Sequence, residues 1–335
     1  MHACSGADAS PWPVGDEGAG LLVVGTDRRA LVPGSVVVVS VSGRFVRQGS
    51  RFRELVAEKP EPGRLHLYVS KACPWASRTV VVRMLKHLED VVPMTVLDPM
   101  RDERGWRFFD DEPDPVNGFR FLREAYEATE PGYDGRVSVP VLWDTSVGRI
   151  VNNESADIIR MFDAWSSAGP KLVPEDLAHA IDELNERIYE TVNDGVYRAG
   201  FARSQEAYEE AFDALFATLD WLDELLATRR YLLGDVITEA DWRLFMTLVR
   251  FDAVYFGHFK CNLRRIEDYA HLSGYLRDLF QEPGIADTVD LDAIKRHYYG
   301  THPSINPTGI VPKGPALDFW RPHGREHVGE ERRAA

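Results

Sequence analysis

One stretch, residues 64–88, constrains the fold more than any other, because a single cysteine stands there between two different periodic patterns. Residues 65–70 are mostly apolar and include β-branched and aromatic side chains, which predicts a buried strand. From Val80 to Leu88, apolar residues recur at helical spacing, which predicts an amphipathic helix. Cys73 therefore lies in the turn where the strand passes into the helix.

The residues around Cys73 favour a reactive thiol. Pro74 fits the first position of the helix, where its missing N–H costs nothing. The thiol then faces unpaired backbone N–H groups and the positive end of the helix dipole, a setting in which cysteines become nucleophiles. A buried structural cysteine is the alternative. Because Ala76 stands where a second cysteine would complete Cys-x-x-Cys, we expect a one-thiol site that forms mixed disulfides with a small external thiol.

Composition limits the classes of partner and compartment. The chain has 335 residues, enough for two domains, and its net charge of -14 argues against a nucleic acid or an anionic membrane as the main partner. Cys4, Cys73 and Cys261 form no disulfide framework, which favours a reducing compartment. The sequence has no secretory-signal pattern and no apolar run long enough to span a bilayer, so we expect a cytoplasmic protein.

Further strand patterns follow in a specific order. They occupy residues 91–97, 138–144 and 148–153, and a helix pattern follows the last of them. We expect the first two strands of the series to be parallel and joined by the helix after Cys73. Residues 98–135 form a long polar insertion, which in a compact domain usually covers a functional site. This order predicts a thioredoxin-like half with its thiol on the first helix.

Two positions beside the later strands favour a binding site. Val139 and Pro140 precede the core of the third strand, and the proline predicts a turn that is compatible with a cis peptide bond. Glu154 and Ser155 open the next helix, where Ser155 is suited to cap it and the free N–H groups favour a bound carboxylate. An ordinary helix cap is the alternative. Beside a thiol site, we favour ligand binding.

The second half has helical periodicity throughout. We expect a poorly ordered leader over residues 1–43, the α/β domain over 44–165, an all-helical domain over 175–300 and a tail over 301–335 that wraps or stays loose. Long helices are predicted at 181–197 and 204–227, and further helical segments follow at 234–251, 272–281 and 292–298. Thr238 and Asp241 form a capping-box pair, which concerns folding and not chemistry. His258 and Cys261 are too few ligands to predict a metal site.

These features together resemble the cytosolic glutathione transferases. The phrases HLYVSKACPWASRT, GRVSVPVLWD, IVNNESADIIRMF and INPTGIVP more narrowly resemble the glutathionyl-hydroquinone reductases, the Xi class. The similarity runs from about residue 42 to 327. It implies an α/β thioredoxin-like N-terminal domain plus an all-α C-terminal domain, the glutathione-transferase fold, and a homodimer.

The resemblance also implies a glutathione-dependent oxidoreductase in which Cys73 is the nucleophile. Glutathione would be a cosubstrate, quinone or hydroquinone conjugates would be the substrates, and no metal is implied. The residues that would bind glutathione are Trp106, Val139, Pro140, Glu154 and Ser155. The quinone pocket would be lined, and a proton delivered, by Tyr197, Tyr255 and Tyr298. Ser77 stands where relatives often have histidine, which changes the surroundings of the thiol.

Each of these assignments has a structural alternative. A tyrosine on a helix often only packs between helices, and Trp106 could be a core aromatic residue in a loop. A phenol can nevertheless recognise a hydroquinone hydroxyl and deliver a proton. Two other functions remain open: a general thiol transferase or dehydroascorbate-reductase-like enzyme, and a non-catalytic ligand-binding module. The second would require an unreactive Cys73.

Overall fold

The computed structural model describes residues 38–39 and 42–329. The predicted leader over 1–43 therefore lies mostly outside the described residues. Within it, β1 (Val38–Val39) pairs antiparallel with β2 (Phe45–Val46). The backbone of Gly43 accepts a hydrogen bond of 2.9 Å from Arg203 N, which ties this segment to the loop before a long helix of the second half.

The first half is built on a four-stranded sheet in the order β4-β3-β5-β6. Its strands are β3 (Leu65–Val69), β4 (Met94–Val96), β5 (Val141–Asp144) and β6 (Arg149–Asn152). β3 and β4 are parallel, whereas β5 is antiparallel to both β3 and β6. Every residue of β3 and β5 is buried, as expected for central strands covered on both faces. The predicted thioredoxin-like order is confirmed, with shorter strands than the sequence patterns suggested.

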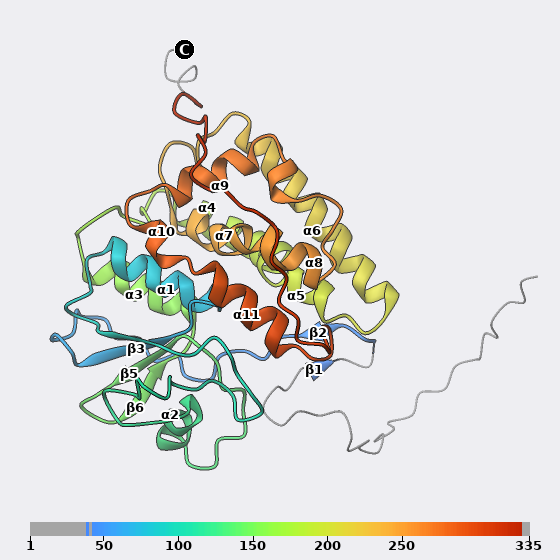
Figure 1. The fold of residues 1–335 in the computed structure, drawn as a ribbon. Coiled ribbons are helices and arrows are strands. Elements are labelled where there is room, and N and C mark those ends of the chain that lie inside the picture. The colour runs from blue at the N-terminus through green and yellow to red at the C-terminus, as the bar shows by residue number, and fades with distance from the viewer. Residues whose placement is uncertain (1–37, 40–41, 330–335) are drawn as a thin grey trace, which may run out of the picture. The chain divides into compact units, whose positions relative to one another are not determined.

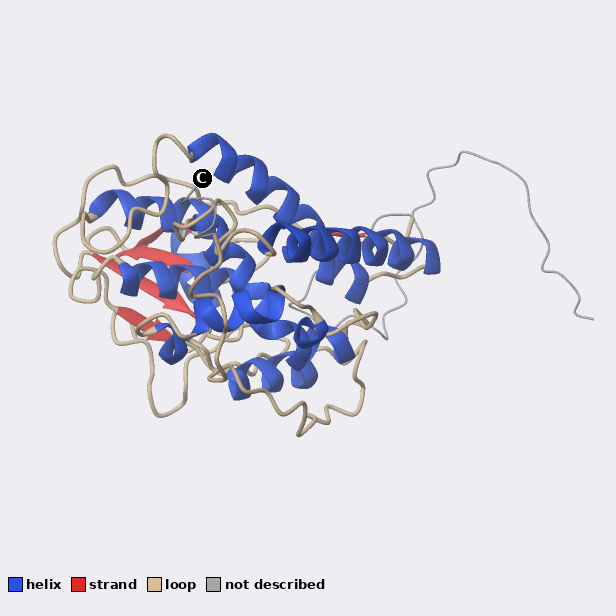
Figure 2. Cartoon of the chain, turned by 90° about the horizontal axis from the view of Figure 1, so that it is seen from above, coloured by secondary structure: helices blue, strands red, loops and turns tan. Residues whose placement is uncertain are grey.

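Three helices pack on this sheet. They are α1 (Pro74–Leu85), α2 (Leu122–Thr129) and α3 (Ser155–Trp165). The helix α1 makes the crossover from β3 to β4 and lies beside α3 on one face, while α2, from the polar insertion, lies on the other (Figure 1). Seen from above, the four-stranded sheet lies at one side among helices, and the other side of the molecule is mostly helical (Figure 2).

The second half is helical, as predicted. Its helices are α4 (Ala178–Ile188), α5 (Gly195–Gly200), α6 (Gln205–Leu226), α7 (Glu239–Arg250), α8 (Phe256–His258), α9 (Leu272–Phe280), α10 (Ile285–Thr288) and α11 (Leu291–Thr301). The expectation of one continuous helix over 181–197 is wrong, because a π-helical segment, η1 (Tyr189–Asn193), separates α4 from α5. Another π-helical segment, η2 (Phe251–Tyr255), joins α7 to α8, and a short 3-10 helix is η3 (Ile266–Asp268). Insertions of this kind are frequent at functional sites.

The start of α7 follows its sequence signature. The backbone N–H and the hydroxyl of Thr238 both donate to the carboxylate of Asp241, at 2.8 and 2.9 Å. Asp241 is completely buried, and burial raises its pKa although four hydrogen-bond donors surround it. The predicted capping box is therefore confirmed as a folding element.

After α11 the chain has no further helix or strand up to residue 329. This segment wraps around the helical half, because the guanidinium of Arg325 donates to the backbone carbonyls of Leu226 and Arg230, at 2.9 and 3.0 Å. Among residues 38–39 and 42–329, no helix is both long enough and apolar enough to cross a membrane.

Candidate active site

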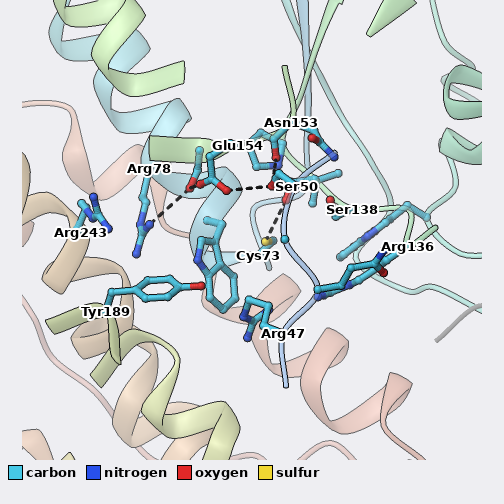
Figure 3. Close-up of a pocket in the computed structure, with 17 residues that line it drawn as sticks. Arg47, Ser50, Cys73, Arg78, Arg136, Ser138, Asn153, Glu154, Tyr189 and Arg243 are labelled. Carbon is cyan, nitrogen blue, oxygen red and sulfur yellow. Dashed lines mark hydrogen bonds between the residues drawn. The ribbon is translucent and has the colours of Figure 1, made fainter. Parts of the chain in front are cut away.

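Cys73 occupies the N-cap position of α1, with Pro74 at the first helical position. Its backbone is extended, with φ of -80° and ψ of 122°, so the side chain leaves the helix axis at the end where the N–H groups are free. The half-buried thiol donates a hydrogen bond of 3.7 Å to the backbone carbonyl of Val139 (Figure 3). The Val139–Pro140 peptide bond is cis.

The turn that carries Cys73 is held by an arginine from the helical half. Arg250, at the end of α7, is fully buried and donates to the backbone carbonyls of Lys71 and Ala72, at 2.8 and 3.3 Å. It also donates to the hydroxyl of Ser77, at 2.7 Å. Ser77, which stands where relatives often have histidine, therefore contacts α7. The thiol's position depends on packing between the two halves.

Cys73 lies in the wall shared by two cavities. The larger cavity, of about 260 Å³, is mainly polar and reaches from Cys73 to the start of α3. The smaller cavity, of about 80 Å³, lies toward the helical half. Cys73, Trp75, Trp106, Arg47 and Arg136 line both.

Glu154 and Ser155 form the far end of the larger cavity. Glu154, and not Ser155 as expected, caps α3: its carboxylate accepts from Ala156 N at 3.1 Å, and Ser155 is the first helical residue. The second carboxylate oxygen of Glu154 accepts a hydrogen bond of 2.9 Å from Ser50 (Figure 3). The Glu154 side chain is long enough for its carboxylate to reach the free N–H of Ala156. Ser155 is therefore not needed as the cap, and it lines the cavity.

Of the two cavities, Arg78 and Arg243 line only the larger, and each has a partner. Arg78 donates to the side chains of Asn193, at 2.8 Å, and Ser155, at 3.4 Å. Burial, followed by repulsion from Arg243, lowers the pKa of Arg78 to about 9. Arg243 donates to the buried carboxylate of Glu239 at 3.0 Å. These cations lie beside the start of α3 (Figure 3), where an anionic group of a ligand would meet them.

The smaller cavity has an aromatic wall. Its aromatic and histidine residues are Phe45, Trp75, Trp106, Tyr197, Phe201, His297, Tyr298 and His302. Trp106 comes from the polar insertion and stacks on His297, with ring centres 4.9 Å apart and planes 12° apart. The insertion therefore reaches the site, as its length suggested.

The three predicted tyrosines form one hydroxyl network. The Tyr298 hydroxyl bonds to the hydroxyls of Tyr197 and, at 2.9 Å, Tyr255. Burial raises the pKa of Tyr197 and of Tyr298 well above the usual value, so both carry their hydroxyl protons at neutral pH. Tyr197 and Tyr298 line the smaller cavity, but Tyr255 is completely buried behind Tyr298 and lines neither cavity. The expectation that all three line the pocket is therefore not met for Tyr255.

Several arginines of the site have no counterpart in the sequence-based prediction. The Arg47 guanidinium lies 3.9 Å from the centre of the Trp75 ring and pairs with Asp194, at the end of the π turn. Arg101 and Arg136 line the smaller cavity. Arg47, Arg101 and Arg136 come from irregular segments, in which periodicity carries no information.

The residues of the weak metal motif have other partners. His258 Nε2 bonds to His302 Nδ1 at 3.1 Å, and the buried thiol of Cys261 donates to the carbonyl of Phe259. Within the described ranges, no three His, Cys, Asp or Glu side chains are grouped so that they could hold a metal ion.

Comparison with known proteins agrees with this geometry. Residues 72–165 match the family "Glutathione S-transferase, N-terminal domain", and residues 205–278 match "Glutathione S-transferase, C-terminal domain". The first match contains Cys73, Val139 and Glu154, and the second covers α6 and α7. Fold and site together define a glutathione transferase.

Comparison with individual relatives identifies the class of glutathione transferase. Glutathionyl-hydroquinone reductase PcpF of Sphingobium chlorophenolicum is 51% identical over 286 residues, which cover 83% of this chain and 91% of the relative. Glutathionyl-hydroquinone reductase YqjG of Escherichia coli is 49% identical over 307 residues, covering 86% and 94%. The chain belongs to the glutathionyl-hydroquinone reductases, the Xi class of glutathione transferases.

Solved structures agree with this placement. The Xi-class transferase from Natrialba magadii superposes with a TM-score of 0.80 at 49% identity, covering 83% of this chain and 89% of that one. The glutathione-bound structure of Escherichia coli YqjG gives a TM-score of 0.77 at 51% identity, covering 79% and 89%. The Saccharomyces cerevisiae Xi transferase ECM4 in complex with glutathione gives 0.78 at 35% identity, covering 84% and 99%.

Proposed function

We propose that this protein reduces glutathionyl-hydroquinones to hydroquinones, with glutathione as the cosubstrate and a mixed disulfide on Cys73 as the intermediate. The position of Cys73 carries the proposal. Its thiol lies at the N-terminus of α1, in the wall shared by a polar and an aromatic cavity. In a glutathionyl-hydroquinone, the thioether sulfur joins the polar tripeptide to the aromatic ring. With the tripeptide in the polar cavity and the ring in the aromatic one, this sulfur would lie beside the Cys73 thiol.

The larger cavity suits glutathione. Glu154 would accept from the γ-glutamyl ammonium group, while Ser155 and the N-terminus of α3 would donate to the neighbouring carboxylate. The backbone of Val139, beside Pro140, would hydrogen-bond the cysteinyl part, and Trp106 would cover the tripeptide. Support for these roles comes from the cavity that the five residues share.

The reaction balances in two steps. In the first, the Cys73 thiolate attacks the thioether sulfur, an S–S bond forms and the C–S bond breaks. The electron pair passes to the ring carbon, which takes up a proton and is thereby reduced to the hydroquinone. In the second step, the thiolate of another glutathione attacks the mixed disulfide, which releases glutathione disulfide and free Cys73.

The tyrosine network would supply the proton of the first step. Tyr298 and Tyr197 line the aromatic cavity, and both carry a hydroxyl proton at neutral pH, as phenols do. Tyr255 would act through Tyr298, to which it is hydrogen-bonded at 2.9 Å. The aromatic wall favours a ring substrate over the small disulfides of a general thiol transferase.

The proposal also assigns roles to the domains, an oligomeric state and a location. The segment 44–165 would bind glutathione, the helical segment 175–300 would bind the ring and form a homodimer, and 301–335 would be a tail. The absence of a disulfide framework in the sequence supports a cytoplasmic location.

The test is glutathione-dependent reduction of 2-glutathionyl-hydroquinone by the wild type. We expect turnover together with a glutathione-sized mass adduct on Cys73. Faster turnover of small disulfides or dehydroascorbate than of the conjugate would favour the general thiol transferase. Neither turnover nor adduct with any of these substrates would favour the binding module.

A further inference from the structure

We propose that the smaller cavity selects hydroquinone conjugates whose ring carries a carboxylate, and that Arg101 is the residue that binds this group. The inference rests on the proposed function and specifies its substrate class. It follows from how the arginines near Cys73 are partnered and from which cavity each of them lines.

Arg101 differs from the other arginines of its loop. Arg104 pairs with Asp102, and Arg107 pairs with Asp98 at 2.6 Å. Arg101 lies between these two carboxylates in sequence, yet its side chain has no hydrogen bond or ion pair with any residue in the described part of the chain. Its only ring contact there is with Trp106, 5.7 Å from the guanidinium carbon. A half-buried cation left without a partner beside available carboxylates is free to bind an external anion.

The whole smaller cavity lacks negative side chains. No aspartate or glutamate of the described ranges is among its lining residues, which include Arg47, Arg101 and Arg136. Burial, and then repulsion from Arg47 and Arg101, lowers the pKa of Arg136 to about 10, so Arg47 and Arg101 both lie close enough to Arg136 to repel it. Such repulsion is relieved when an anion enters.

The histidines do not share this role. Burial, followed by repulsion from Arg101, lowers the pKa of His297 to about 3, and the pKa of His302 is also strongly lowered. Both rings are therefore neutral at neutral pH, and the positive charge of the cavity belongs to its arginines.

Arg101 is placed to bind a group other than glutathione, because it does not line the larger cavity. Arg136 lines both cavities and can serve either partner, whereas Arg101 lines only the smaller one. Apart from the Cys73 thiolate, whose charge also acts on Arg101, an anion that reaches Arg101 would arrive on the ring. A carboxylate matches the planar guanidinium with two parallel hydrogen bonds. An ionised ring hydroxyl is the other source of an anionic oxygen, and the experiment separates the two.

The experiment compares three conjugates of glutathione: those of hydroquinone, of 2,5-dihydroxybenzoate and of the methyl ester of that acid. The ester matches the acid in its hydroxyls and nearly in shape but lacks the charge. For the wild type we expect kcat/KM to be at least about tenfold higher for the acid than for the ester. In Arg101→Met we expect this ratio to fall to near one, and in Arg101→Lys to stay above it.

Arg104→Met is the matched control, because Arg104 belongs to the same loop but lines neither cavity near Cys73. It should retain the wild-type ratio. Arg101→Lys keeps the charge and so separates charge recognition from a folding defect in Arg101→Met.

Three outcomes would overturn the inference. Equal turnover of acid and ester by the wild type would exclude a carboxylate site. Equal losses for all three conjugates in Arg101→Met would assign Arg101 to a charge on ring oxygens that every conjugate has. Failure of the wild type on all three conjugates would instead reject the proposed function, and this inference with it.

Discussion

The two cavities that meet at Cys73 differ in whether their arginines have hydrogen-bond partners within the protein. Arg78 and Arg243 line only the larger cavity, and each has a fixed partner, Asn193 and Glu239 respectively. Arg101 lines only the smaller cavity and has no polar partner among the residues that the structure describes. Partnered cations keep their geometry without a ligand, as suits a cosubstrate that is the same in every turnover. An unpartnered cation in an aromatic wall suits a substrate whose ring substituents vary.

The largest effect should come from the residue that both cavities share. In Cys73→Ser we expect kcat for 2-glutathionyl-hydroquinone to fall by at least about 10³-fold, because a serine hydroxyl cannot form the mixed disulfide. Glutathione binding, measured by calorimetry, should change little because the larger cavity keeps its other residues. Residual turnover near one tenth of the wild-type value would mean that another group is the nucleophile.

A smaller loss of kcat should distinguish Tyr298, which lines the aromatic cavity, from Tyr255, which lies behind it. In Tyr298→Phe we expect kcat for the conjugate to fall by about 10²-fold, since the cavity loses a proton donor. Tyr255→Phe is the matched comparison, with an expected loss of about tenfold, because its hydroxyl acts through Tyr298. Single-turnover release of hydroquinone measures the step directly. Equal losses in the two variants would contradict this ordering.

The larger cavity can be tested through a single hydroxyl. In Ser155→Ala we expect KM to rise about tenfold for both glutathione and the conjugate, since both carry the γ-glutamyl group and lose one charge-assisted hydrogen bond. Ser146→Ala, in the exposed turn between β5 and β6, should leave both values within twofold. A rise confined to the conjugate would place Ser155 on the ring side and erase the contrast between the cavities.

The smallest effect concerns stability in mild acid. Burial lowers the pKa of His258, which is bonded to His302, to about 4. Because the folded-state pKa lies below the unfolded value of about 6.5, the unfolded chain binds more protons between these values. This contribution to stability is complete above about pH 6.5 and is lost as the pH falls toward 4.

We therefore expect the Tm to fall by a few degrees between pH 7.5 and pH 5.0. The fall should be smaller in His258→Gln, which keeps a polar side chain but does not titrate. An equal fall in the two proteins would assign the acid sensitivity to other groups. His258 lines neither cavity, but its hydrogen bond to His302, which lines the smaller one, links this sensitivity to the ring side.

Local sequence signals predicted the frame of the site. The strand and helix periods around Cys73 are short-range features, and they indicated the β-α-β order and the thiol at the start of α1. The same holds for the start of α3 at Glu154 and Ser155, although the capping residue proved to be Glu154. Period and capping depend on neighbours within a few residues, so a sequence alone displays them.

Which side chains are buried, and which of them contact one another, could be learned only from the tertiary structure. Tyr197 and Tyr298 are 101 positions apart and meet only because α5 and α11 converge, while Tyr255 lies one hydrogen bond behind them. Arg101 and Arg136 lie in irregular segments that have no periodic pattern. The amino-acid sequence by itself thus determined the thiol, its helix and the family. Packing between distant segments decided which side chains face the ring and which charges remain without a partner, because those contacts have no local signature.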